Sequence, residues 1–135
     1  MCRWWGGYIY GQYLAVSPIA QRVGVGKMLL EKGVEIAKEN NLTYISGDTS
    51  QYATWSIKWH KRMGYKIVGY DSFYKTDYYS YIFRLQIKPS ILWNNALFCK
   101  IVFLFSYIKT KAMMTNKGEL TFFGRLVSRI YRLFR

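Results

Sequence analysis

Apolar and turn-forming residues alternate along the first 87 positions in a pattern that predicts six short elements. The run from Tyr8 to Val16 is aromatic and β-branched, as strands are, and Ser17-Pro18 should end it. Further along, apolar residues recur at the spacing of an amphipathic helix. The predicted elements are, in chain order, a strand over 8–16, a helix over 27–40, a strand over 42–47, a helix over 54–63, and strands over 66–70 and 78–87.

Two turn signals support these boundaries. Asn40-Asn41 should stop the first helix, and Gly64 should end the second as a left-handed C-cap. The resulting order of strands and helices is typical of an α/β fold. We therefore predict one α/β domain over residues 1–87.

Residues 88–135 form a second segment, a helical C-terminal extension. Lys88-Pro89-Ser90 marks its start, and 14 of the next 18 residues are apolar. A bilayer span needs about 20 apolar residues and tolerates a central charge such as Lys100 poorly. We expect the segment over 91–108 to pack on protein or lie at an interface. A turn at 116–118 then precedes a basic amphipathic helix, with one stripe of Phe123, Leu126, Val127, Ile130 and Phe134 and another of Arg125, Arg129 and Arg132.

The net charge of +13 is distributed unevenly. Residues 1–87 hold 11 Lys or Arg against 6 Asp or Glu, whereas residues 88–135 hold 9 against Glu119 alone. A basic field suits a polyphosphate cofactor, nucleic acid or an acidic lipid surface. We do not expect nucleic acid, because no recognised binding module is present and the tyrosines fall in strand patterns where they pack.

Cysteine and histidine usage suggests a reduced, metal-free protein. Cys2 and Cys99 are far apart with no pairing rhythm, and the single histidine has no cysteine cluster near it. The start of the chain lacks the pattern of a secretory signal peptide. We therefore expect a cytoplasmic protein.

The segment Gln21-Arg22-Val23-Gly24-Val25-Gly26-Lys27 carries the clearest chemical signal. It follows a predicted strand and opens a predicted helix, where unpaired N–H groups and the helix dipole favour an anion. Gly24 and Gly26 would let the backbone approach a phosphate, and Arg22 and Lys27 add positive charge. The alternative is an ordinary tight turn between a strand and a helix.

Two other phosphate-binding motifs do not fit. A dinucleotide fingerprint needs a third Gly or Ala where Leu29 stands. A P-loop needs a glycine where Gln21 stands and Ser or Thr where Met28 stands.

The same stretch resembles the GNAT (Gcn5-related) N-acetyltransferase superfamily. LAVSPIAQRVGVGKMLLEKGVEIA is similar to the family's strand, Gln/Arg-x-x-Gly-x-Gly/Ala loop and helix. SIKWHKRMGY is similar to the family's later helix, which ends in Tyr-x-x-x-Gly-Phe. The resemblance covers about residues 8–87. It implies a mixed sheet with flanking helices, and transfer of an acetyl group from acetyl-CoA to an amine of a small molecule or peptide.

The resemblance also implies roles for individual residues. The backbone of Leu14, Ala15 and Val16 would pair with the pantetheine arm of acetyl-CoA. His60 falls where many members have a tyrosine that protonates the departing thiolate, and an imidazole could do the same. Alternatively, His60 only packs in its helix beside Trp59. The pyrophosphate would lie against Gln21, Arg22, Val23, Gly24, Val25, Gly26 and Lys27.

The sequence departs from the family pattern in two places. Ala53 stands where the family often has an Asn that contacts CoA. A full domain has three strands and two helices before the strand that begins near Tyr8, but only MCRWWGG precedes it here, and no acidic residue precedes Glu31. We therefore expect an N-terminally incomplete domain without an early general base.

Three functions remain open at this point. The chain is an acetyltransferase, an inactive fragment of one, or a basic module that docks on an acidic membrane surface through residues 88–135. We expect this extension to be dispensable for cofactor binding. It would either contact the membrane or cover the sheet edge that the absent N-terminal strands leave open.

Overall fold

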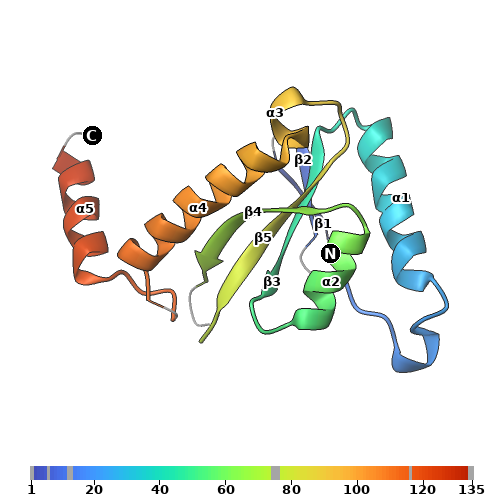
Figure 1. Ribbon diagram of the computed structural model, residues 1–135, viewed down its shortest axis with the longest axis horizontal. Coiled ribbons are helices and arrows are strands. Elements are labelled where there is room, and N and C mark those ends of the chain that lie inside the picture. Colours follow the sequence, from blue (N-terminus) through green and yellow to red (C-terminus); the bar gives the residue numbers. More distant parts are fainter. Residues whose placement is uncertain (1, 6, 12–13, 74–76, 116, 134–135) are drawn as a thin grey trace.

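The protein is built around one five-stranded mixed sheet with helices packed beside it (Figure 1). The computed structural model describes residues 2–5, 7–11, 14–73, 77–115 and 117–133. The strand order is β1-β2-β3-β5-β4, with β2 and β3 parallel and the other neighbours antiparallel. The strands are β1 (Cys2–Trp5), β2 (Tyr8–Gly11), β3 (Tyr44–Ser50), β4 (Lys66–Ser72) and β5 (Tyr79–Gln86).

Five α-helices and one short 3-10 helix complete the described part of the chain. In Figure 1, α1 and α2 lie to the right of the sheet, and α4 and α5 lie to the left. The helices are η1 (Pro18–Ala20), α1 (Val25–Glu39), α2 (Thr54–Arg62), α3 (Ile91–Asn94), α4 (Ala96–Met113) and α5 (Phe122–Leu133).

The predicted α/β order is confirmed, with corrections to its boundaries. The strand expected over 8–16 ends at Gly11, its residues 12 and 13 lie outside the described part, and Leu14 to Ser17 are irregular. The strand expected to end at Gly47 continues to Ser50. Strand β1, which pairs antiparallel with β2, was not predicted from the sequence.

The core lies between the sheet and helices α1 and α2. Ala37 on α1 and Phe83 on β5 are fully buried. The left-handed C-cap predicted at Gly64 is confirmed: Gly64 has a φ of +86°, and Tyr65 N–H donates to His60 O at 3.0 Å. This turn brings Tyr65 under the helix. The core cluster consists of Ile9, Ala37, Leu42, Ile45, Tyr65 and Phe83.

The helix expected over 91–108 is two helices, and the reason is a second capping residue. Asn95 is extended, and its Oδ1 accepts hydrogen bonds from the N–H groups of Leu97 and Phe98 at 2.8 and 3.2 Å. The side chain therefore starts α4 anew after the single turn of α3. In the part of the chain that the structure describes, no helix is long and apolar enough to span a bilayer. The amphipathic helix expected after residue 118 is α5, although Phe134 lies outside the described residues.

Helix α4 covers the outer edge of β4. Ser106 Oγ accepts from Tyr70 N–H at 2.9 Å and donates to Tyr70 O at 3.0 Å. Thr110 Oγ1 donates to the same carbonyl at 2.7 Å. Two hydroxyls on one helix face thus satisfy backbone groups that an edge strand would otherwise expose. This edge is the one farthest from β1 in the strand order, so α4 does not cover the edge that the sequence analysis suggested.

The beginning of the extension is also held to the sheet. The Arg84 guanidinium lies between two rings, 3.5 Å from the centre of Tyr44 and 3.9 Å from that of Trp93. Burial lowers the pKa of Arg84 from its ordinary value. Lys66 Nζ donates to the carbonyl oxygens of Trp93 and Asn94 at 3.0 and 2.5 Å. Residues 90–113 are therefore integrated with the β4–β5 side of the sheet.

We predict that the double variant Ser106→Ala/Thr110→Val is less stable than the unchanged chain. Both changes remove hydroxyls bonded to Tyr70, and each lost bond should cost roughly 1 kcal/mol of the free energy of unfolding. Urea unfolding followed by circular dichroism measures the difference. Thr54→Val, at an exposed position on α2, is the matched control and should change little. Equal stability of the double variant and the control would contradict an edge-covering role.

Candidate functional site

The site begins where two parallel strands part. Strands β2 and β3 are in register from Tyr8 and Tyr44 to Gly11 and Gly47. A Cβ on Gly47 would lie 3.3 Å from Gly11 O, so the last pair of the ladder is close. Beyond this pair β3 continues to Ser50 beside β5, while Leu14 to Ser17, the next described residues after β2, are irregular. Ligands commonly bind beyond the carboxyl ends of parallel strands at such a divergence.

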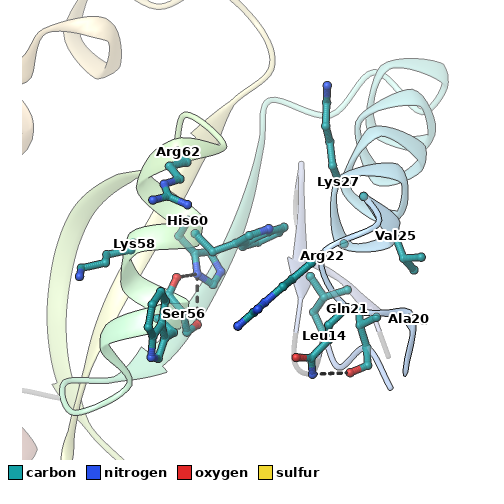
Figure 2. A pocket seen from close by; sticks show the side chains of 15 residues that line it. Leu14, Ala20, Gln21, Arg22, Val25, Lys27, Ser56, Lys58, His60 and Arg62 are labelled. Atoms are coloured by element: carbon teal, nitrogen blue, oxygen red, sulfur yellow. Dashed lines mark hydrogen bonds between the residues drawn. The ribbon is translucent and has the colours of Figure 1, made fainter. Parts of the chain in front are cut away.

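Two adjoining cavities occupy the space that the divergence opens. The larger, of about 970 Å³, lies between the 20–27 segment and α2 (Figure 2). The smaller, of about 470 Å³, extends along β3 from Ile45 to Ser50. Leu14, Ser56, Trp59 and His60 line both. A single elongated ligand could therefore reach from one into the other.

The N-terminus of α1 opens into the larger cavity. Gly24 is the N-cap, with a left-handed φ of +92° that other residues rarely adopt. It brings no side-chain oxygen to the first amides of the helix, and the first turn holds no acidic residue. Gly26 lies against the Trp59 ring, which a Cβ would approach to 3.6 Å. The helix starts two residues earlier than predicted, so Val25, Gly26 and Lys27 form its first turn.

The walls of the larger cavity are basic. Arg22, Lys27, Lys58 and Arg62 line it, and none of the described residues that line it is acidic. Figure 2 shows Arg22 extended across the gap toward α2, whereas Lys58 extends from α2 away from the loop. Gln21 Nε2 donates to Val16 O at 2.9 Å and ties the loop to the segment after β2. The cavity is therefore suited to an anionic ligand.

Most of the residues singled out from sequence meet around these cavities. Ala15 lines the smaller one. Val23 lines neither, and its side chain is 71% exposed. The residues that line the larger cavity are Leu14, Val16, Gln21, Arg22, Gly24, Val25, Gly26, Lys27 and His60.

His60 stands at the junction of the two cavities in one defined tautomer. Its Nδ1 lies 2.8 Å from Ser56 O, and a carbonyl can only accept, so Nδ1 carries the hydrogen. Nε2 is then the unprotonated nitrogen of the neutral ring. The ring stacks on Phe83 with centroids 4.6 Å apart and meets Trp59 and Tyr65 edge-on. Burial lowers the pKa of His60, although the Ser56 carbonyl and Asp48 oppose that shift.

Tyr10 and Asp48 form a pair that the sequence analysis missed. The Tyr10 hydroxyl donates a short hydrogen bond to Asp48 Oδ1. Burial, and then this carboxylate, raise the pKa of Tyr10 above its ordinary range. Asp48 lines the smaller cavity, near enough to His60 to favour its charged form. The polar run Asp48-Thr49-Ser50 at the carboxyl end of a buried strand was the available signal.

The described residues contain no group of three or more His, Cys, Asp or Glu side chains placed to hold a metal ion.

A family model matches the part of the chain that supplies most of the residues lining these cavities. Residues 2–65 match the acetyltransferase (GNAT) family, and they include β1, β2, the loop, α1, β3 and α2. This part of the chain is therefore similar to the GNAT acetyltransferases. A comparison with curated proteins gave no match.

Solved GNAT structures share the fold. A protein from Desulfovibrio desulfuricans assigned to the GNAT acetyltransferases aligns at 22% identity and TM-score 0.56, covering 62% of this chain and 54% of its own. The ribosomal-protein-S18-alanine N-acetyltransferase of Escherichia coli aligns at 18% identity and TM-score 0.58, covering 67% and 61%. Arabidopsis thaliana NAA60, solved with acetyl-CoA, aligns at 21% identity and TM-score 0.55, covering 59% and 48%.

These alignments confirm the GNAT-like fold expected from the sequence. The chain spans roughly half to three fifths of the length of the GNAT structures it matches. At these identities the likeness establishes the architecture, and the chemistry has to be argued from the residues of this chain.

We predict that the pKa of His60 lies below the ordinary histidine value of about 6.5 and falls further in Asp48→Asn. Burial disfavours the imidazolium, and Asp48 is the carboxylate that partly restores it. Because the chain has one histidine, its ring Cε1–H signal can be followed by NMR without assignment. Glu39→Gln, at the far end of α1, is the matched control.

The same titration has a consequence for stability. The unfolded chain takes up the histidine proton near pH 6.5, whereas the folded ring takes it up only at lower pH. The free energy of unfolding should therefore decrease as the pH falls through this window. A pKa above the ordinary value, or one that rises in Asp48→Asn, would contradict the described geometry.

Proposed function

We propose that this chain binds acetyl-CoA and catalyses transfer of the acetyl group to an amine of a small molecule or peptide. The observation that carries the proposal is the connection of two cavities through His60: a basic one at the start of α1, and a smaller one that holds Asp48. The first suits the polyphosphate end of acetyl-CoA. The second suits the amine and the reacting carbonyl.

The pyrophosphate would lie at the N-terminus of α1. Amides of the first turn and the helix dipole stabilise negative charge there, and Gly24 leaves the approach open because a Cβ would meet nothing within 4 Å. Arg22 reaches into the same gap. The pantetheine arm would then pass Leu14, which lines both cavities, so that the thioester arrives beside His60.

In the proposed reaction the neutral amine attacks the thioester carbonyl carbon. A C–N bond forms, the C–S bond breaks, and CoA leaves as a thiolate that must gain a proton. The ammonium form of the acceptor cannot attack, so a proton has to leave it first. We assign the acceptance of this proton to Asp48, because its carboxylate lines the acceptor cavity and its negative charge favours the charged form of His60.

The tautomer of His60 limits what this residue can do. With Nδ1–H donated to Ser56 O, the resting ring has no proton to give from Nε2. The His60 ring could protonate the thiolate only after it has accepted a proton itself. The attacking amine can provide this proton, because its nitrogen must lose one when the C–N bond forms. We therefore assign His60 the role of a relay, from the attacking nitrogen to the departing sulfur.

The assignment of the loop predicts that Gly24→Val/Gly26→Leu abolishes CoA binding. Valine cannot adopt the left-handed conformation of residue 24 without strain, and a leucine at residue 26 would project against Trp59 into the cavity. The thermal shift induced by CoA should disappear. Lys38→Gln at the far end of the same helix is the control, because Lys38 is exposed and lines neither cavity.

A second variant separates loss of binding from loss of folding. Arg22 is exposed, so Arg22→Gln should leave the melting temperature without ligand unchanged while weakening CoA binding several-fold, most strongly at low salt. Full CoA-induced stabilisation in both the glycine double variant and Arg22→Gln would rule out this phosphate site.

The proposed chemistry predicts that His60→Phe and Asp48→Asn each lower kcat by roughly 10²-fold or more while acetyl-CoA affinity changes little. Release of the CoA thiol, measured against a panel of amino acids, polyamines and peptide N-termini, gives the rates. Glu35→Gln, an exposed carboxylate on α1 remote from both cavities, is the control. A rise in the KM for acetyl-CoA with unchanged kcat would instead assign His60 a packing role.

A further inference from the structure

Helix α4 exposes a continuous apolar face on the side opposite the sheet. Cys99 and Thr110 are buried, and Ser106 bonds to Tyr70, so these residues mark the inner side of the helix. The outward side repeats at three- and four-residue intervals, which keeps it on one face along the helix. Its members and their exposed fractions are Leu97 (66%), Ile101 (44%), Leu104 (54%), Phe105 (71%) and Ile108 (56%).

Lysines flank this outward face on both sides. By helical periodicity Lys100 falls along one border and Lys109 along the other, whereas Lys111 Nζ lies 3.9 Å from the centre of the Tyr79 ring on β5. Lys100 and Lys109 are exposed. An apolar strip with basic borders is the arrangement of helices that lie in the plane of a membrane interface.

Helix α5 repeats the arrangement. Phe122, Phe123, Leu126 and Ile130 are 79%, 55%, 46% and 47% exposed. Arg125 and Arg129 are exposed along one border of this stripe.

The two helices are joined tightly at one point. The Met114–Leu120 bridge closes the turn between them, and Gly124 lies so close to Met113 O that an added Cβ would clash with it. The turn therefore holds the start of α5 against the end of α4.

We propose that the outward face of α4 and the apolar stripe of α5 dock on an anionic phospholipid bilayer. We call these two stripes together the α4–α5 surface. The charge of the segment complements such a bilayer, since residues 88–135 hold 9 basic residues and one acidic residue. Isolated exposed apolar side chains are common, but a run of nine on two adjoining helices marks an interaction surface.

A second copy of the chain fits this surface less well. A symmetric dimer places the same patch on both partners, so the lysine borders of one copy would face those of the other. Like charges held together in this way oppose association, whereas lipid phosphates would neutralise them.

The proposed orientation keeps the candidate active site accessible. In Figure 1, α4 and α5 lie on the left of the sheet, and α1 and α2, which line the cavities, lie on the right. A bilayer against the α4–α5 surface would leave the cavities facing water. Docking therefore does not require the proposed acetyl transfer, and the two proposals can fail separately.

Co-sedimentation of the full chain with vesicles tests the proposal. Vesicles of phosphatidylcholine with about a third phosphatidylserine should bind the protein at low salt, and vesicles of phosphatidylcholine alone should bind it much more weakly. Binding should decrease as salt shortens the Debye length from about 10 Å at 0.1 M to about 3 Å at 1 M. Leu104→Glu/Ile108→Glu should lower the partition coefficient by roughly tenfold or more.

Ile19→Glu is the matched control, because Ile19 is 96% exposed and lies in η1, away from α4. Arg125→Gln/Arg129→Gln should weaken binding to the anionic vesicles only, while Lys38→Gln on α1 should not. Circular dichroism checks that each variant is folded. The proposal is overturned if the full chain ignores anionic vesicles at low salt, if the α4 double variant binds as well as Ile19→Glu, or if light scattering shows a dimer that this variant dissolves while vesicle binding persists.

Discussion

The parting of β2 and β3 is the constraint on which the candidate site depends. The strands pair closely as far as Gly11 and Gly47, where the backbones are too near for a side chain to fit comfortably. Past this point β3 keeps its bonds to β5 through Ser50, and Leu14 to Ser17, the next described residues after β2, are irregular and lead to the 21–27 loop. A rigid strand therefore forms one wall and a helix start the other. Asp48, Leu14 and the N-terminus of α1 come together because the pairing of β2 with β3 ends at Gly11 and Gly47.

At the opposite edge of the sheet, the strand is covered by a helix. There α4 covers the edge of β4 with the hydroxyls of Ser106 and Thr110, which take the place of a further strand. The same helix leaves its outward face apolar and exposed. The two roles considered for the extension, covering protein and contacting a membrane, therefore fall on different faces of one helix and do not exclude each other.

Local signals predicted the elements well, and long-range pairing accounts for what was missed. The helix spacing, the Gly64 cap and the glycine loop are properties of neighbouring residues, so the sequence was sufficient for them. The pair Tyr10–Asp48 exists only because β2 and β3 are in register, which no local pattern encodes. The break at Asn95 was hidden by the apolar run around it, although Asn is a strong N-cap residue. β1 was missed because four residues are too few for a periodic pattern.

The fixed tautomer of His60 bears on the order of events in the proposed reaction. A ring whose Nδ1–H is held by a backbone carbonyl can exchange protons only at Nε2, and burial keeps that nitrogen unprotonated near neutral pH. The relay therefore cannot begin with the thiolate. The amine must lose its proton to the ring as the new C–N bond forms. The resulting imidazolium, stabilised in part by Asp48, then donates this proton to the sulfur as the C–S bond breaks. The low pKa of the ring, which makes it a poor acid at rest, makes it a strong one once it has been charged.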